Sequence, residues 1–201
     1  MIGLLVKIKH KCPALWFFAE KVNCRLAGVR YRQLKTKSRE VLKNKFLDGF
    51  TFSMVEPRDI PAIIEMHDRQ NPEYIRNFNP HPFNQPTLSD MASNNAYSLM
   101  KVTDDSSGKL VGYFFIRSFF VGKAFHGLLT DERFANKGIG SAMWRISMEI
   151  CHLTGLSMFA TMAQDNIASL KSAKNGTKVN IVNQLDNSFI LIECGLKHPI
   201  R

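Results

Sequence analysis

The segment Thr130 to Ala142, TDERFANKGIGSA, constrains the fold of this chain more than any other part of it. The aromatic and apolar run 125–130 predicts a strand that ends at the start of this segment. Apolar residues then recur at spacings of three and four, which predicts a helix over 138–153. Glycines let backbone N–H groups approach an anion closely, and a helix N-terminus adds unpaired donors. This strand, loop and helix therefore predict a phosphate or pyrophosphate site.

The rest of the chain predicts a mixed α/β fold. Extended, β-branched or aromatic runs predict strands over 50–55, 97–102, 110–120, 125–130, 156–161, 178–185 and 188–194. Helices are expected from Ile60, from Thr87 as N-cap, over 138–153, and over 166–175 with Gly176 as C-cap. Between the first two of these helices, residues 71–86 predict a long Asn- and Pro-rich loop.

The net charge of +10 lies entirely in the first part of the chain. Residues 1–46 hold twelve of the 27 basic residues and two of the 17 acidic ones, so residues 47–201 are balanced. A helical apolar stripe is predicted from Leu15, Phe18, Val22, Leu26 and Val29. Ser38 is expected to cap a second short helix. The sequence thus predicts a basic, amphipathic helical extension over 1–46 and a domain over 47–201.

The cysteines and the apolar runs indicate a cytoplasmic protein. Cys12, Cys24, Cys151 and Cys194 are widely spaced, whereas a disulfide scaffold or a zinc site would pair its cysteines. We therefore expect reduced thiols and no metal. No apolar run approaches the roughly 18 residues of a membrane span. The stretch 12–19 lacks the cleavage pattern of a secretory signal.

Three kinds of ligand compete for the predicted anion site. A Rossmann site would need a third glycine at Met143 and a carboxylate after the next strand, and a P-loop would need GxxxxGK[ST]; both are absent. Coenzyme A is the third. The order of strand, x-x-x-G-x-G loop, apolar helix, strand and a helix opened by Asn166 resembles the GNAT superfamily of acetyl-CoA-dependent N-acetyltransferases over about residues 50–201.

This resemblance implies a twisted, mostly antiparallel central sheet flanked by helices, with acetyl-CoA as the cofactor. The family's loop motif, Arg/Gln-x-x-Gly-x-Gly/Ala, begins here with Ala135, so that Lys137 is expected to supply the missing charge. The residues expected to contact the cofactor are Leu128, Leu129, Thr130, Asn136, Lys137, Gly138, Ile139, Gly140, Ser141, Asn166 and Ser169.

The reaction implied by the resemblance is attack of a primary amine on the acetyl thioester, which needs a base for the amine proton. His126 is the one titratable residue of the preceding predicted strand, and its ordinary pKa of about 6.5 would suit a base. Asp131 and Glu132 are expected to be solvated. Many family members carry an acidic Tyr seven residues after the helix Asn; this position is Ala173 here.

The acyl acceptor is expected to contact the long loop over 71–86. Its candidate contacts are Tyr74, Arg76, His81 and Phe83, whose aromatic and hydrogen-bonding groups suit an amino sugar or a nucleotide sugar. The sequence leaves the identity of this small-molecule amine open.

Two further alternatives stay open at this stage. The protein could bind coenzyme A without catalysis, as an adaptor, because the family's acid is missing. The basic arm over 1–46 could lie on an anionic membrane at the inner surface, bind nucleic acid, or pack on the domain or on a second copy in a homodimer. We expect no specific nucleic-acid partner, because the body of the protein is electrically balanced.

Overall fold

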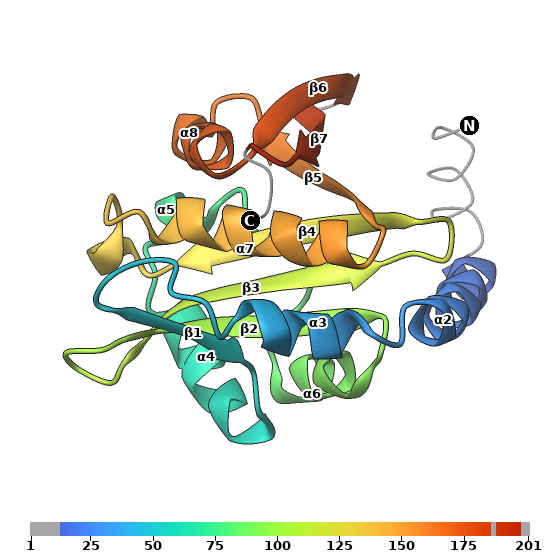
Figure 1. Cartoon of the computed structure of the whole chain (residues 1–201), viewed down its shortest axis with the longest axis horizontal. Helices are drawn as coiled ribbons and strands as arrows, with labels where there is room; N and C mark the ends of the chain where they lie inside the picture. The colour runs from blue at the N-terminus through green and yellow to red at the C-terminus, as the bar shows by residue number, and fades with distance from the viewer. Residues whose placement is uncertain (1–12, 186–187, 198–201) are drawn as a thin grey trace.

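A seven-stranded sheet organises the computed structural model, which describes residues 13–185 and 188–197, with side chains from residue 20 onward (Figure 1). Its strands lie in the order β1-β2-β3-β4-β5-β7-β6. They span β1 (Phe50–Met54), β2 (Tyr97–Asp104), β3 (Leu110–Ser118), β4 (Lys123–Thr130), β5 (Ser157–Ala163), β6 (Lys178–Leu185) and β7 (Phe189–Gly195). Neighbouring strands are antiparallel except β4 and β5, which are parallel. The predicted mixed, mostly antiparallel sheet is confirmed.

Helices cover both faces of this sheet (Figure 1). The helices are α2 (Pro13–Arg30), α3 (Leu34–Val41), α4 (Ile60–Asp68), α5 (Pro72–Ile75), α6 (Gln85–Ser93), α7 (Ile139–Leu153) and α8 (Ile167–Gly176), with short 3-10 turns η1 (Pro57–Asp59) and η2 (Glu132–Phe134). Side chains alternate along a strand, so Phe114 packs with α3 and α7, whereas Tyr113 and Phe115 pack with α4 and α6. The sheet therefore separates two apolar cores.

The N-terminal helices differ from the prediction. Ala27, Tyr31, Leu34 and Val41 are buried in the larger core, so this part of the predicted extension over 1–46 packs into the body of the protein. Ser38 is not an N-cap: it lies inside α3, and its hydroxyl donates to the carbonyl of Leu34 at 2.8 Å. The predicted apolar stripe is exposed where its side chains are described, at Val22, Leu26 and Val29, and the side chains of Leu15 and Phe18 lie outside the described ones.

The predicted loop over 71–86 contains a short helix and the start of another. Asn71 caps α5 by accepting from the backbone N–H of Glu73 at 2.9 Å. Asn84, rather than the predicted Thr87, caps α6, and it accepts from the Thr87 N–H at 3.0 Å. Both corrections follow from the Asn-Pro and Asn-Gln-Pro sequences, in which Asn caps and Pro suits the first turn.

The described residues show two further features. Among them, no helix has the length and apolar character to cross a membrane. Cys24, Cys151 and Cys194 are free thiols, and Cys12 lies outside the described residues.

Candidate active site

A cavity of about 1050 Å³ opens where β4 and β5 diverge. The two strands pair only between Lys123–Phe125 and Ser157–Phe159. Beyond these residues, the edge of β4 over 126–130 has no partner strand on its β5 side. Both strands line the cavity through residues 125–130 and 160–162, and the β4–α7 loop, α8 and residues 76–81 complete its walls. Strand divergence therefore creates the site and leaves backbone donors and acceptors facing it.

The β4–α7 loop forms one end of this cavity. Asn136 and Gly138 have φ values of 62° and 84°, a left-handed conformation that Gly and Asn adopt most readily. The hydrogen bonds of α7 begin with the N–H of Ala142, which donates to the Gly138 carbonyl at 3.0 Å. The N–H groups of the preceding residues 139–141 have no partner within the helix. They and the helix dipole would therefore favour a bound pyrophosphate.

The predicted cofactor residues come together here, with one exception. Leu128, Leu129, Thr130, Asn136, Gly138, Ile139, Gly140, Ser141, Asn166 and Ser169 all line the cavity. Lys137 does not line it, since its ammonium group lies over the Phe134 ring, 4.6 Å from the ring centre. The structure therefore places Lys137 beside a residue of the cavity wall and not in the wall itself, and its contact with the cofactor stays a prediction.

α8 lies beside the end of this loop and lines the cavity, with Ser172 next to Gly140. Asn166 caps this helix by accepting from the Ser169 N–H at 3.0 Å, while also lining the cavity. Ala173 is fully buried in the core and does not face the cavity. The neighbouring Ser172 does line it, with its hydroxyl donating to the Ser169 carbonyl at 2.8 Å. Ala173 itself therefore supplies no acid to the cavity.

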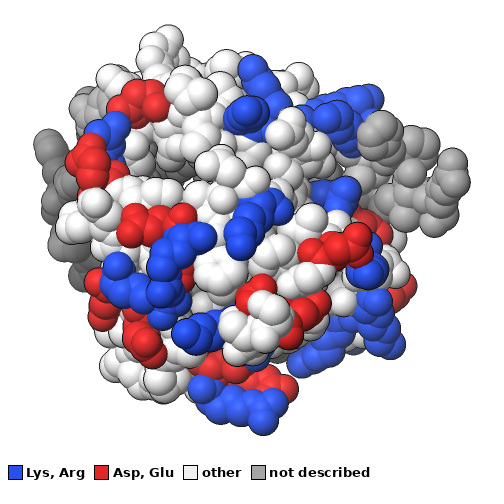
Figure 2. Space-filling model, turned by 90° about the vertical axis from the view of Figure 1, so that its left-hand side faces the viewer, with Lys and Arg blue, Asp and Glu red and all other residues white. Residues whose placement is uncertain are grey.

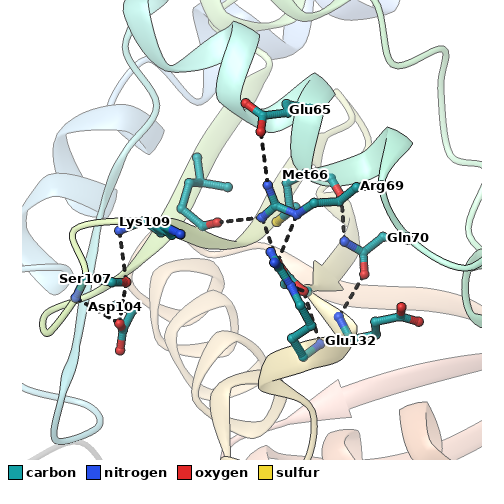
Figure 3. Close-up of polar contacts among 11 residues, drawn as sticks. Glu65, Met66, Arg69, Gln70, Asp104, Ser107, Lys109 and Glu132 are labelled. Carbon is teal, nitrogen blue, oxygen red and sulfur yellow. Dashed lines mark hydrogen bonds and ion pairs between the residues drawn. The ribbon is translucent and has the colours of Figure 1, made fainter.

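An ion-pair cluster at the end of α4 holds the start of the β4–α7 loop (Figure 3). The Asp131 carboxylate is fully buried and accepts from Arg69 and from Arg133, each at 2.7 Å. The Gln70 side chain accepts from the Glu132 N–H at 2.8 Å. The prediction that Asp131 is solvated is therefore wrong: its carboxylate connects the loop to α4.

The pKa of Asp131 is set by two opposing effects. Burial alone would raise its pKa, but hydrogen bonds from Arg133 and Arg69 outweigh burial and hold the pKa well below its usual value. The end of the molecule that carries η2 faces the viewer in Figure 2, where acidic and basic groups lie intermixed over its lower part. Local pairing, and not a large field of one sign, therefore characterises this end.

Replacing Asp131 by Asn is expected to lower the free energy of unfolding at pH 7 by about 1–2 kcal/mol, since its charged hydrogen bonds with two arginines weaken. A depressed pKa means that the carboxylate stabilises the fold above its unfolded pKa of about 3.9, and that this contribution is lost as pH falls toward the folded pKa. The difference between variant and wild type should therefore shrink between pH 5 and pH 3, as measured by urea denaturation.

Asp165→Asn is the matched control for this prediction. Asp165 pairs with Arg76 at 2.8 Å, but its side chain is 65% exposed. Exposed pairs contribute little, so this variant should change stability by less than about 0.5 kcal/mol. Equal effects of the two variants would contradict the structural role of Asp131.

His126 lies on β4 with its side chain turned toward α7. Its ring contacts Trp144 with ring centres 4.4 Å apart, and Nδ1 lies 3.3 Å from the Phe115 carbonyl. Burial lowers the pKa of His126 to about 3, and the bond to Phe115 only partly opposes this shift. The expectation of a base with an ordinary pKa near neutrality is therefore wrong, because a ring this buried is a weak proton acceptor.

The expected acceptor residues divide into two groups. Tyr74, Arg76 and His81 line the cavity. Phe83 does not line it, but stacks on His67 with ring centres 3.9 Å apart and packs in the smaller core. Its predicted role in binding is therefore wrong.

His81 occupies a defined position at this end. Nδ1 lies 3.1 Å from the Pro82 carbonyl and Nε2 lies 3.2 Å from the Tyr113 hydroxyl. Because the carbonyl can only accept, Nδ1 carries the hydrogen and Nε2 accepts from Tyr113. Burial lowers the pKa of His81, so its imidazole is neutral near pH 7.

Several cavity residues carried no signal in the sequence. Tyr97, Phe115, Arg117, Phe119 and Phe125 line the acceptor side. Four of them share one face of the sheet. Tyr97 and Phe125 both pair with Arg117, from the strands on either side of it, and Phe115 lies on the same face of β3 because it is two residues from Arg117. Only the strand pairing brings them together, and the aromatic content of 110–120 was the one hint available. No group of three His, Cys, Asp or Glu in the described chain could hold a metal ion.

Comparison with known proteins agrees with this geometry. The acetyltransferase (GNAT) family model matches residues 63–176, and the chain therefore belongs to this family. Family members use acetyl-CoA as the acetyl donor, so acetyl-CoA is the cofactor here and the protein is an acyltransferase by family.

Solved structures share the fold at low sequence identity. The ribosomal-protein-S5-alanine acetyltransferase of Vibrio fischeri has a TM-score of 0.59 at 14% identity, covering 75% of this chain and 94% of that one. The yncA protein of Salmonella typhimurium, with its cofactor acetyl-CoA, has a TM-score of 0.55 at 18% identity, covering 73% and 92%. RimL, a ribosomal L7/L12 alpha-N-protein acetyltransferase in complex with coenzyme A, has a TM-score of 0.61 at 11% identity, covering 76% and 96%. The search of curated proteins returned no match.

Proposed function

We propose that this protein transfers the acetyl group of acetyl-CoA to the primary amine of a small polar acceptor, with an amino sugar or a nucleotide sugar as the substrate class. The observation that carries this proposal is the single cavity that joins the anion-binding loop, the open edge of β4 and the residues at 74–81. Such a cavity would hold donor and acceptor side by side, as a direct transfer requires.

The residues present fit acetyl-CoA at the loop end. The N–H groups of residues 139–141 suit the pyrophosphate, and the unpaired edge of β4 suits the amide-rich pantetheine chain. When bound, acetyl-CoA supplies an acetyl thioester as the electrophile. Backbone N–H groups of the β4 edge over 126–130 would stabilise the oxygen that becomes negative during attack.

The acceptor side offers neutral and cationic polar groups set among aromatic rings. Asn77 and Asn79 supply amide groups, while Phe119 and Phe125 supply ring faces. Sugar rings combine hydroxyl groups with apolar C–H faces, so this mixture suits them. No Asp or Glu lines the cavity among the described residues, so a strongly cationic acceptor such as a polyamine would find no carboxylate partner.

We assign the amine proton to His81 rather than to His126. His81 is only half-buried, lines the acceptor end and directs its Nε2 lone pair at the Tyr113 hydroxyl. The hydroxyl can rotate and release this nitrogen, whereas the His126 ring is held between β4 and Trp144. Transfer of the amine proton to Nε2 would leave the nitrogen lone pair free to attack the thioester carbon.

Histidine variants test this assignment. His81→Gln is expected to lower kcat at least about tenfold and to remove the acidic limb of its pH profile, with KM for acetyl-CoA unchanged. His126→Gln should leave that limb in place, since its ring is not the proton acceptor. An acidic limb retained in the His81 variant and lost in the His126 variant would reverse the assignment.

Two measurements test the proposed function as a whole. Calorimetry with acetyl-CoA should show saturable binding, and absence of heat at millimolar ligand would refute the cofactor site. Thiol release should then appear with amino sugars or nucleotide amino sugars. Binding without thiol release on any amine would favour a coenzyme A-binding adaptor. Release with peptide N-termini alone would favour the kind of acceptor named for the ribosomal-protein acetyltransferases.

A further inference from the structure

The outer face of α2 carries an apolar stripe that the described part of the chain leaves uncovered. Val22, Leu26 and Val29 are 40%, 45% and 71% exposed, and helical geometry places them on one side. The buried Ala27 lies on the opposite side of the helix, and it packs into the larger core together with Tyr31, the residue that follows the helix. The stripe therefore points directly into solvent.

The turn between β3 and β4 extends this apolar surface. Phe120 and Val121 are 43% and 72% exposed. Asn23 of α2 accepts from the Phe120 N–H at 3.2 Å, and Arg30 donates to the Phe120 carbonyl at 2.6 Å. Leu26 lies between these two positions on the helix, so the turn flanks the stripe. We call Val22, Leu26, Val29, Phe120 and Val121 the α2 apolar surface.

Basic side chains border this surface. Lys21, Arg25, Arg30 and Arg32 are exposed. The one acid of α2, Glu20, is an ion-pair partner of Arg117 in the cavity wall, so its charge is turned toward the body of the protein. The sequence before α2, residues 1–12, adds three lysines, five aliphatic residues from Ile, Leu and Val, and no acid.

We infer that the α2 apolar surface docks on an anionic lipid membrane. Aliphatic and aromatic groups would enter the boundary between headgroups and acyl chains, while Lys and Arg would meet the anionic headgroups. Two copies of this surface packed face to face would oppose like charges at Arg25 and Arg30, which disfavours a second copy as the occupant. A nucleic acid would pair with the basic side chains but would leave the apolar side chains exposed to water, which disfavours it as the occupant as well.

Co-sedimentation of the full chain with vesicles tests this inference. The wild type should pellet with vesicles that contain phosphatidylglycerol, and much less with phosphatidylcholine alone or in high salt. Leu26→Asp/Val29→Asp should reduce the apparent affinity at least about tenfold, because each methylene moved out of the acyl region weakens binding. Val29→Asp alone should give a smaller loss in the same direction.

Matched controls separate docking from misfolding. Ile181→Asp/Val182→Asp alters two aliphatic residues of β6 that are 62% and 46% exposed, and should pellet as the wild type does. All variants should keep the circular dichroism spectrum and the melting temperature of the wild type. The inference is overturned if wild type fails to pellet, pellets equally without anionic lipid, or pellets no better than the Leu26/Val29 variant. Loss of a dimer in that variant, without vesicle binding by the wild type, would assign the surface to a second copy.

Discussion

Ser141→Glu is expected to weaken acetyl-CoA binding about thirtyfold while leaving the fold intact. Ser141 lines the cavity in the first turn of α7, where the pyrophosphate is proposed to lie. A carboxylate a few ångströms from a phosphate at a partly exposed site costs about 2 kcal/mol, and every 1.4 kcal/mol is about tenfold in affinity. The same charge favours a helix N-terminus, so stability should hold or rise slightly.

Ser141→Gln is the control for this prediction. Glutamine has almost the same size and shape as glutamate, but carries no charge. Calorimetry should find its affinity for acetyl-CoA within a few-fold of wild type, and the deficit of the Glu variant should shrink as salt rises. Equal losses in both variants would indicate a steric effect, and an unchanged affinity in the Glu variant would show that no phosphate lies at this helix end.

Gly176→Ala is expected to lower the free energy of unfolding by about 3 kcal/mol, the upper part of the usual range for overpacking. Gly176 ends α8 where this helix packs on α7. A Cβ atom there would lie 2.5 Å from the Ser141 carbonyl oxygen and 2.7 Å from the Trp144 Cβ. Neither atom can move without moving α7, so the two helices must separate. Since both line the cavity, acetyl-CoA affinity should fall as well.

Gly195→Ala tests whether the loss at Gly176 comes from this contact. A Cβ at Gly195 would meet nothing nearer than the Lys178 Cβ at 3.8 Å, an ordinary contact. Urea denaturation should show a change within about 0.5 kcal/mol. A Gly176 variant as stable as the Gly195 variant would mean that α7 and α8 adjust to the extra atom at little cost.

The core of the fold follows from local patterns in the sequence. The strands and the helices α7 and α8 were predictable because apolar spacing, turn residues and glycine placement act within a few residues of one another. The segment 130–142 was predictable for the same reason, since a loop that ends in Gly138-Ile139-Gly140 before an apolar helix presents its own N–H groups.

Longer-range contacts produced the errors. Phe83 and Asp131 each lie in a polar stretch of the sequence. The structure nevertheless packs Phe83 against other aromatic rings and buries Asp131 between two arginines. The His126 ring meets Trp144 of α7, a contact that lowers its solvation and its pKa. The helical spacing of Val22, Leu26 and Val29 predicted an apolar stripe on α2, but these residues face outward, and Ala27 and the following Tyr31 pack in the core instead.

The sequence alone thus determined the order of the main strands and helices, the glycine-containing loop before α7 and the position of the basic charge, because each depends on residues close together in the chain. The tertiary structure decided which side chains share the cavity. The pairing of β3 with β4 brings Arg117 next to Phe125, the contact of His81 with Tyr113 brings the loop before α6 to the same place, and the divergence of β4 from β5 opens the cavity there. Burial and charge pairing, which exist only after folding, then decided which of these groups can hold or accept a proton.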